Sequence, residues 1–208
     1  MNKLTIIVTY YNAEEYITGC LESIKQQRTQ DFNLIIVNDG STDQSKKLMD
    51  EAIKDYDKNI RFIDLDENSG HAHARNIALE EVETPYFMFL DADDELASYA
   101  ITFYLEKFNN TDGLIAPIHS FTTQRPQFVD LDRVRVEYFN AKENINSFLR
   151  KQSACNIIFR TAIVRAHHIR FNENLNTYVD WSFVLEYMKY VNKFVRIFNF
   201  PFYFRGEV

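Results

Sequence analysis

The stretch Phe87–Leu96, FMFLDADDEL, runs from apolar residues straight into acids. Its apolar part is typical of a strand that is covered on both faces, as in a parallel sheet. The acids are Asp91, Asp93, Asp94 and Glu95. Carboxylates this close raise one another's proton affinity unless a positive group lies among them. The stretch therefore predicts a buried strand ending in charged groups, whose partner is solvent, a basic side chain or a metal ion.

The same order, an apolar run and then a polar end, occurs twice upstream. Leu4–Val8, LTIIV, precedes the segment TYYN, and Phe32–Val37, FNLIIV, precedes the turn NDGSTD. Residues 60–65 predict one more strand. Between and after these strands, apolar residues recur at helical spacing over 14–27, 43–55, 71–82 and 98–108. Such alternation predicts a parallel, doubly wound α/β sheet, in which ligands collect beyond the carboxyl ends of the strands.

The alternation weakens after Gly113. Residues 113–118 and 154–160 predict strands, and residues 121–139 predict irregular or antiparallel chain. Helices are expected from Thr161 and over Asp180–Tyr190, and an aromatic strand over 200–208. The inner side of the later helix is expected to carry Trp181, Val184, Leu185 and Met188. This part of the chain is therefore expected to complete the same domain with a less regular pattern.

Composition narrows the class of protein. A chain of 208 residues with 46% hydrophobic and 15% aromatic residues can bury one substantial core and is not disordered. The net charge of −7 argues against a nucleic-acid binder. Cys20 and Cys155 form neither a metal spacing nor a disulfide framework, which suits a reducing compartment. The N-terminus resembles neither a signal peptide nor a membrane span. We therefore expect a cytoplasmic protein whose contact with the membrane, at its inner face, is peripheral.

The acids after the fourth predicted strand suit a cation. Asp91 and Asp93 share one side of an extended chain, because side chains alternate along a strand. Two carboxylates on one side suit Mg²⁺ or Mn²⁺, which keep open positions for phosphate oxygens and water. Asp94 and Glu95 fit a different explanation, as acids that favour the N-terminus of the next helix.

Three other polar residues each leave two explanations open. Asp39 either accepts a hydrogen bond from an N–H group of a ligand at the sheet edge, or is only part of a tight turn. Tyr10 or Tyr11 suits stacking on a planar base, or packs in the core. The guanidinium fork of Arg75 suits a phosphate or a base edge, or is a surface charge on a helix.

Four segments in this order resemble the successive blocks of family 2 glycosyltransferases, the inverting enzymes of the GT-A fold. They are TIIVTYYNAEEYITGCLESIKQQ (5–27), LIIVNDGSTDQS (34–45), NSGHAHARNIAL (68–79) and YFMFLDADDEL (86–96). The resemblance implies a GT-A-type, Rossmann-like α/β/α sandwich with a mainly parallel central sheet. It also implies metal-dependent transfer of a sugar from a UDP-sugar donor to a hydroxyl of a glycan or polyol-phosphate acceptor. Bacterial cell-envelope polymers of the teichoic-acid type are the expected acceptors.

The resemblance also implies roles for single residues. Tyr11 would stack on the base, usually uracil, and Asp39 would bond to it. Asp93, together with Asp91, would hold Mn²⁺ or Mg²⁺ on the diphosphate. The residues around the donor nucleotide would be Thr9, Tyr11, Asn12, Asp39, Arg75 and Asp91. The nucleotide-sugar-binding half would span 1–112 and the acceptor-side half 113–208 of a single domain, which is expected to be the first domain of a longer protein.

The later part of the chain follows the family pattern with one departure. Asp180 matches the second acid of the family's acid pair, the usual catalytic base. Val179 stands where the first acid is common, so Glu173 is the alternative base. The Gln-x-x-Arg-Trp motif of processive synthases is absent, because Trp181 is the only tryptophan. Processive synthesis through an attached membrane channel is therefore not expected.

Two other functions compete with sugar transfer. Haloacid-dehalogenase-like phosphatases also begin with an apolar strand and Asp-x-Asp, but their pattern has Thr or Val where this chain has Glu95. A catalytically degenerate nucleotide-sugar-binding or interaction module of a larger cell-wall enzyme is favoured by Val179. Mg²⁺-dependent phosphate release from a generic phosphoester would identify the phosphatase, and a UDP-sugar hydrolysis assay with Mn²⁺ would separate the inactive module from the transferase.

Overall fold

The computed structural model describes residues 2–56, 59–107, 111–120, 130–140, 153–199 and 202–206. The strands are β1 (Leu4–Tyr10), β2 (Phe32–Asn38), β3 (Ile60–Asp64), β4 (Tyr86–Asp91), β5 (Glu95–Leu96), β6 (Gly113–Ile115), β7 (Ile118–Ser120), β8 (Val136–Asn140), β9 (Ile157–Arg160), β10 (Lys193–Ile197) and β11 (Tyr203–Arg205). The helices are α1 (Ile17–Lys25), α2 (Ser45–Ile53), α3 (His71–Glu80), α4 (Ala100–Lys107), α6 (Thr161–Ala166) and α7 (Val179–Met188), with 3₁₀ turns η1 (Leu131–Arg133) and η2 (Ala154–Asn156).

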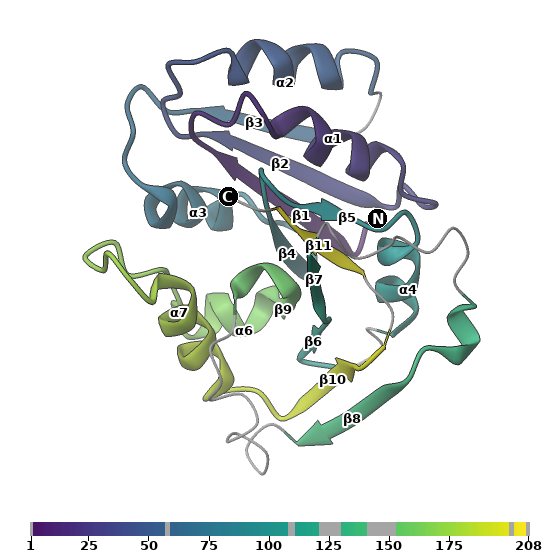
Figure 1. Cartoon of the computed structure of the whole chain (residues 1–208). Coiled ribbons are helices and arrows are strands. Elements are labelled where there is room, and N and C mark those ends of the chain that lie inside the picture. Colours follow the sequence, from purple (N-terminus) through teal and green to yellow (C-terminus); the bar gives the residue numbers. More distant parts are fainter. Residues whose placement is uncertain are drawn as a thin grey trace.

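The described strands form one large sheet and one small sheet. The large sheet has eight strands in the order β3-β2-β1-β4-β9-β6-β10-β8, and the small sheet has the order β5-β11-β7. Helices α1 and α2 lie on one face of the large sheet and α3 lies on the other (Figure 1). The predicted α/β architecture with a mainly parallel central sheet is therefore confirmed.

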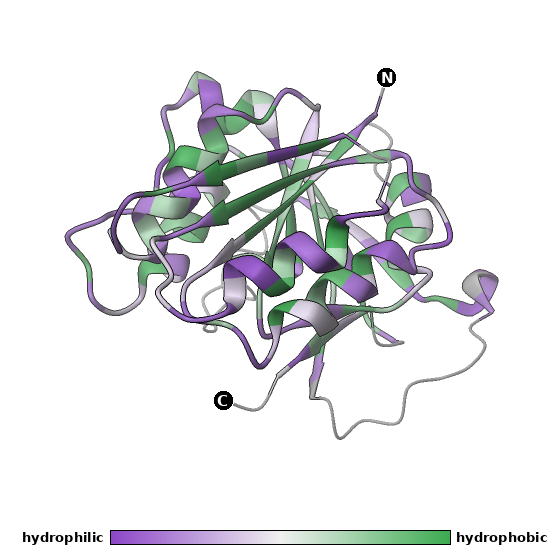
Figure 2. Ribbon diagram, turned by 90° about the horizontal axis from the view of Figure 1, so that it is seen from above, coloured by the Kyte–Doolittle hydropathy of each residue, from purple (hydrophilic) through white to green (hydrophobic). Residues whose placement is uncertain are grey.

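The parallel strands align their polar ends at one edge of the sheet. Strand β1 pairs in parallel with both β2 and β4, and Thr9 lies in register with Val37 and with Asp91. Nearly every residue of these three strands is buried, which explains their unbroken apolar runs. Figure 2 shows hydrophobic residues concentrated on the strands and hydrophilic residues on the outer faces of the helices. The segments that follow β1 and β4 are thus brought together.

The second half of the large sheet is mixed. Strand β9 lies antiparallel between β4 and β6, and β8 pairs antiparallel with β10. The irregular or antiparallel chain predicted over 121–139 is confirmed from residue 130, where a 3₁₀ turn and a loop lead into the antiparallel strand β8. The strand predicted over 113–118 is two strands in different sheets, β6 and β7. Pro117 lies between them and has no N–H to continue a ladder.

Helix α7 buries two of the four residues predicted for its inner side, Val184 and Met188. Its buried residues are Val179, Phe183, Val184, Tyr187 and Met188. Trp181 and Leu185, which were expected on the inner side, are only partly buried. The helix is apolar nearly all round, so its sequence does not fix which side faces the core. The ring of Phe183 stacks on that of Phe171 at 4.1 Å, and this contact helps to set the side that is buried.

The small sheet brings the end of the described chain to the acids. Strand β11 pairs with β5, so that Phe204 lies opposite Glu95, and its other neighbour is β7. Gly206 follows β11 directly and contacts the acidic turn. Among the described residues, no helix combines the length and the apolar character needed to cross a bilayer.

Candidate functional site

A cavity of about 490 Å³ lies beyond the carboxyl ends of β1 and β4. We call it the carboxylate cavity. Every site residue predicted from the sequence lines it, with the exceptions of Asp39 and the alternative base Glu173. The predicted residues in its wall are Thr9, Tyr11, Asn12, Arg75, Asp91, Asp93 and Asp180. The expected convergence of distant segments at one edge of the sheet therefore occurs.

Arg75 is the centre of this site. Its side chain comes from α3 and is buried against the rings of Phe89 and Phe171, with its guanidinium carbon 5.3 Å from each ring centroid. Its Nη2 donates to Oδ1 of Asp91 at 2.6 Å, and its Nη1 donates to Oδ1 of Asp180. Burial disfavours the charged guanidinium, yet the two carboxylates raise the pKa of Arg75 above its usual range. The acids at the end of β4 were expected to need solvent, a basic side chain or a metal ion beside them. For Asp91, that partner is the basic side chain of Arg75.

Asp180 is held as a carboxylate at the cavity wall. Its Oδ2 accepts hydrogen bonds from the N–H of Ala154 at 3.0 Å and from Oγ of Ser153 at 3.2 Å. Burial alone would raise the pKa of Asp180, but the charge of Arg75 and these donors lower it below its usual range. An ionised carboxylate in a cavity wall can accept a proton from a bound hydroxyl.

Asp91 and Asp93 have different surroundings. Oδ2 of Asp91 accepts from the thiol of Cys155 at 3.0 Å, so both oxygens of Asp91 are engaged. Burial raises the pKa of Cys155 well above its usual range, which keeps it a thiol donor. Within the described part of the chain, the carboxylate of Asp93 has no partner from another residue, and burial and the charge of Asp91 raise its pKa. Among the described residues, Asp93 therefore has no direct ion pair, although the charges of Arg205 and Arg75 act on it from a distance.

The donor set fits a hard divalent cation. Oxygen atoms of Asp91, Asp93 and Asp94 lie within 4.8 Å of one another. Carboxylate oxygens are the ligands that Mg²⁺ and Mn²⁺ prefer, and the carboxylate of Asp93 is bound directly by no other described side chain. Asp93 and Asp91 would hold such an ion. Each carboxylate oxygen of Asp91 already accepts one hydrogen bond, so it would bind the ion through a remaining lone pair.

The explanation expected for Asp94 and Glu95, acids at a helix N-terminus, is wrong. Helix α4 begins only at Ala100, and Glu95 begins β5. Asp94 lies in a turn, its N–H donating to the carbonyl of Asp91 at 3.0 Å. The chain turns back here because β5 pairs with β11, a partner from the far end of the described sequence.

Asp39 shapes the site from outside the cavity. It is 3% exposed, and its two carboxylate oxygens accept from the backbone N–H groups of Ser69 at 2.8 Å and Gly70 at 2.9 Å. These contacts fix the loop that leads into α3, the helix that carries Arg75. Asp39 therefore holds the loop at Ser69 and Gly70, and through this loop it supports the position of α3.

The two tyrosines after β1 differ in accessibility. Both line the carboxylate cavity, but Tyr10 is only 3% exposed, whereas Tyr11 is 46% exposed. Asn12 adopts a positive φ of 47° and its Oδ1 accepts from the N–H of Thr42 at 2.9 Å. Of the two rings, only that of Tyr11 is available to stack on a planar ligand.

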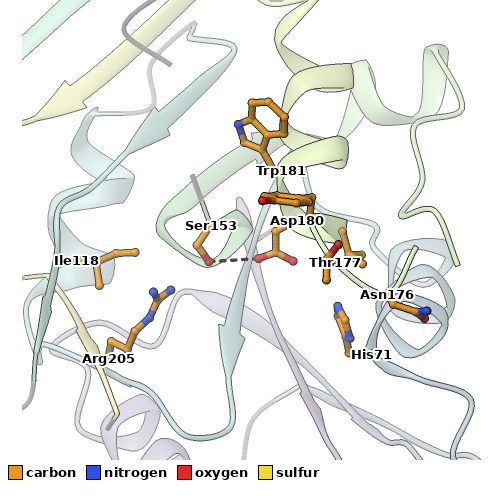
Figure 3. Close-up of a pocket in the computed structure, with 10 residues that line it drawn as sticks. His71, Ile118, Ser153, Asn176, Thr177, Asp180, Trp181 and Arg205 are labelled. Carbon is orange, nitrogen blue, oxygen red and sulfur yellow. Dashed lines mark hydrogen bonds between the residues drawn. The ribbon is translucent and has the colours of Figure 1, made fainter. Parts of the chain in front are cut away.

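A second cavity, of about 430 Å³, shares His71 and Asp180 with the first. We call it the tryptophan cavity. Figure 3 shows Asp180 in the middle of its lining, with Arg205 on one side and His71 on the other. Trp181 also lines it, and its buried Nε1 has no partner among the described residues. Asp180 therefore lies where two cavities meet.

Glu173, the alternative base, lies apart from both cavities. Its Oε1 accepts from Nδ2 of Asn76 at 2.7 Å, and its Oε2 pairs with Nδ1 of His73 at 3.0 Å. It is absent from the lining of either cavity. These contacts make Glu173 a link between the 171–178 segment and α3.

Sequence reasoning missed several residues that form the site. Cys155 and Ser153 contact the two acids, and Arg205 and Trp181 line the tryptophan cavity. None of them belongs to a motif with a chemical pattern of its own. The one usable signal was the position of Trp181 directly after the predicted base.

Comparisons with known proteins give a consistent result. The model of the family described as Glycosyl transferase family 2 matches residues 5–170. An uncharacterized glycosyltransferase of Haemophilus influenzae is 29% identical over 195 residues, which cover 93% of this chain and 74% of that protein. TarS of Staphylococcus aureus strain Mu50, a poly(ribitol-phosphate) beta-N-acetylglucosaminyltransferase, is 28% identical over 201 residues. That match covers 89% of this chain and 32% of TarS.

A solved structure supports the same relationship. The crystal structure of S. aureus TarS 1–349 in complex with UDP superimposes with a TM-score of 0.81 at 25% identity. The match covers 99% of this chain and 60% of that chain. The predicted family and the predicted GT-A fold are both confirmed.

Proposed function

Because this chain belongs to glycosyl transferase family 2, we propose that it transfers a sugar, with inversion, from a UDP-sugar to a hydroxyl of a glycan or polyol-phosphate acceptor. One observation carries the proposal: Arg75 joins Asp91, at the end of β4, to Asp180, at the start of α7. An acid suited to the donor and an acid suited to the acceptor thus lie on either side of one guanidinium.

The donor nucleotide is assigned to the carboxylate cavity. The exposed ring of Tyr11 suits the base, and Thr9 and Asn12 lie beside it in the cavity wall. The likeness to TarS, whose solved structure contains UDP, supports a uridine nucleotide. When bound by Asp93 and Asp91, Mn²⁺ or Mg²⁺ would offset the negative charge that grows on the departing diphosphate.

Asp180 is assigned the role of general base. It would take the proton of the acceptor hydroxyl on a carboxylate oxygen as that hydroxyl forms the new bond to the anomeric carbon. Arg75, Ala154 and Ser153 hold the carboxylate ionised and fixed in direction. A single displacement by a hydroxyl on the face opposite the leaving UDP inverts the configuration. The low pKa of Asp180 means that proton transfer would follow, not precede, most of the bond formation.

The acceptor is assigned to the tryptophan cavity. This cavity meets the carboxylate cavity at Asp180, as a hydroxyl acceptor requires. The rings of Tyr178 and Trp181 offer apolar faces to a sugar or polyol, and Arg205 offers a positive charge to a phosphate. On this assignment residues 1–112 form the donor side and residues 113–208 supply most of the acceptor side. A cell-envelope polymer as acceptor would bring the protein to the inner face of the membrane by peripheral contact.

A nucleotide-sugar-binding module without activity is the second candidate. Val179 favours it, because this residue is 4% exposed and supplies no acid beside Asp180. The ion pair and hydrogen bonds of Asp180 favour the active enzyme, since they fix a carboxylate where a base is needed.

The deciding experiment measures UDP release from a panel of UDP-sugars, with Mn²⁺ or with EDTA, alone and with glycan and polyol-phosphate acceptors. Transfer predicts Mn²⁺-dependent UDP release that an acceptor accelerates, with a product whose mass increases by one sugar. UDP binding without release from any donor would support the inactive module. Mg²⁺-dependent phosphate release from a generic phosphoester would support a phosphatase instead.

A further inference from the structure

Asp94 differs from the other acids of the turn in what surrounds it. It is 1% exposed, and its Oδ2 accepts from the hydroxyl of Tyr203 at 2.5 Å. Its Oδ1 accepts from the backbone N–H of Gly206 at 2.8 Å. Asp91 and Asp93 line the carboxylate cavity, but Asp94 does not. An oxygen of Asp94 lies within 4.8 Å of oxygens of Asp91 and Asp93, but both of its carboxylate oxygens are already bound by residues of the β11 segment.

The two partners of Asp94 flank Arg205 in the sequence. Tyr203 is fully buried, and its hydroxyl also lies 3.4 Å from the backbone N of Asp91. Gly206 follows Arg205 directly, so Asp94 fastens the chain on both sides of that residue. Strand β11 pairs with β5 at two residues and with β7 at three, and Arg205 is the last residue of the β7 ladder. Neither ladder includes Gly206, so the contact of Asp94 with Gly206 holds the chain just beyond Arg205, where the strand pairing has ended.

We propose that Asp94 is a positioning residue that holds Arg205 in the wall of the tryptophan cavity, and that it is not a third ligand of the cation at Asp91 and Asp93. Arg205 is exposed, lines that cavity and forms no ion pair within the described residues. This inference rests on the proposed function: Arg205 then binds an anionic group of the acceptor, such as a phosphate next to the attacking hydroxyl.

The first test needs no activity. Amide hydrogen exchange of Gly206, followed by NMR, should be at least about 10-fold faster in Asp94→Ala than in the wild type, because its acceptor is gone. Asp94→Asn keeps an acceptor oxygen and should retain most of the protection. Tyr203→Phe removes the phenol alone and should leave Gly206 protected. Equal protection in the wild type and in Asp94→Ala would overturn the proposal.

The second test separates positioning from metal binding. Calorimetric titration with Mn²⁺ in the presence of UDP should give affinities within about 3-fold of the wild type for Asp94→Asn and for a matched exposed control, Asp66→Asn. Asp93→Asn should lose the affinity. A loss in Asp94→Asn that matches Asp93→Asn would make Asp94 a ligand and refute the proposal. If the wild type binds no Mn²⁺, Asp94 is no ligand, and the exchange experiment decides its role.

The third test is a double-mutant cycle on transfer. Asp94→Ala and Arg205→Gln should each lower kcat/KM for a phosphate-bearing acceptor by about 10-fold, and the double variant should be no worse than either. Additive losses would refute the coupling. UDP affinity should be retained in Arg205→Gln, and a loss there would assign Arg205 to the donor diphosphate instead. If the wild type transfers no sugar to any acceptor, the proposed function fails, while the exchange and Mn²⁺ experiments still decide the role of Asp94.

Discussion

The two halves of the large sheet place their side chains by different rules. In the first half, each of the parallel strands β1 to β3 is followed by its own helix, and polar residues occur where the strands end. In the second half, β9, β6, β10 and β8 come from scattered positions and mix two directions. In the first half, a local sequence pattern therefore marks where the polar residues at the sheet edge will lie. In the second half, strands that are distant in sequence pair with one another, so no local pattern marks which residues are brought together.

This difference separates two functions on the proposed assignment. The turns that follow β1 and β4 supply Tyr11 and Asp93 to the donor. The later part of the chain, which also forms the second half of the large sheet, supplies Asp180 from α7 and Arg205 from β11 of the small sheet to the acceptor. Variants of the first half should change nucleotide binding, while variants of the second should change turnover with binding retained. The predictions that follow test this division.

The largest effect is expected from Asp180→Asn. Loss of the general base should lower turnover by about 10²–10⁴-fold, while UDP affinity measured by calorimetry should stay within about 3-fold of the wild type. Glu173→Gln is the matched control, because this acid lies apart from both cavities, and it should keep near wild-type turnover. Undiminished turnover in Asp180→Asn would discard the base assignment, and a large loss in Glu173→Gln would move it to that residue.

Asp93→Asn should weaken the metal-dependent binding of the donor nucleotide. Without the unpaired carboxylate, the affinity for UDP in the presence of Mn²⁺ should fall by about 100-fold, which is about 2.7 kcal/mol. Calorimetry in EDTA should show little difference between this variant and the wild type, because no ion is then lost. An equal loss in EDTA would mean that Asp93 acts on the nucleotide without a cation.

Gly40→Ala tests the backbone that shapes the first half. Gly40 has a φ of +66°, and an added Cβ would lie 2.4 Å from the backbone carbon of Glu67. Left-handed strain and this clash together should cost about 2–3 kcal/mol of unfolding free energy in urea. Gly70→Ala isolates backbone strain, because no atom lies within 4 Å of its added Cβ, while its φ of +89° and ψ of 149° are essentially confined to glycine. It should cost about 1–3 kcal/mol from strain alone. A cost of Gly40→Ala below about 1 kcal/mol would show that the clash with Glu67 is relieved by movement of that loop.

Tyr11→Ala should weaken the binding of UDP, because it removes the ring proposed to stack on the base of the nucleotide. A lost base–aromatic stack should lower UDP affinity by about 10-fold, and Tyr11→Phe should retain it. Tyr178→Ala removes an exposed ring of the other cavity and should leave UDP affinity unchanged. A greater loss of UDP affinity in Tyr178→Ala than in Tyr11→Ala would reverse the assignment of the two cavities.

The contrast also explains which parts of the molecule could be predicted. The strands and helices up to β4 could be predicted, because each is coded by its own apolar pattern and the ends of parallel strands meet. Arg75 and Asp180 are 105 residues apart, so no local pattern announces their ion pair. The true setting of Asp94 depends on Tyr203, 109 residues away. Two of the four residues expected on the buried side of α7 were misjudged because apolar residues occupy most of its positions.

The smallest effects expected are opposite pH dependences of two acids. The pKa of Asp180 is lowered in the folded chain, so its ion pair stabilises the fold above about pH 4 and this stabilisation is lost as the pH falls through the lower, folded pKa. Asp180→Asn should therefore cost less unfolding free energy at pH 3 than at pH 7. Urea unfolding at both pH values measures the difference. An equal cost at both would mean that the pair with Arg75 contributes no net stability.

Asp94 should show the reverse sign in the absence of metal. Burial raises its pKa to about 6, so its ionisation is disfavoured in the folded chain and the fold loses stability as the pH rises from about 4 through 6. Asp94→Asn does not ionise, and it should therefore cost less unfolding free energy at pH 7 than at pH 4. Added Mn²⁺ should leave this difference unchanged, because the carboxylate is bound to Tyr203 and Gly206 and not to the cation. If Mn²⁺ abolished the difference, Asp94 would belong with Asp93 in the cation site and not with the strand that carries Arg205.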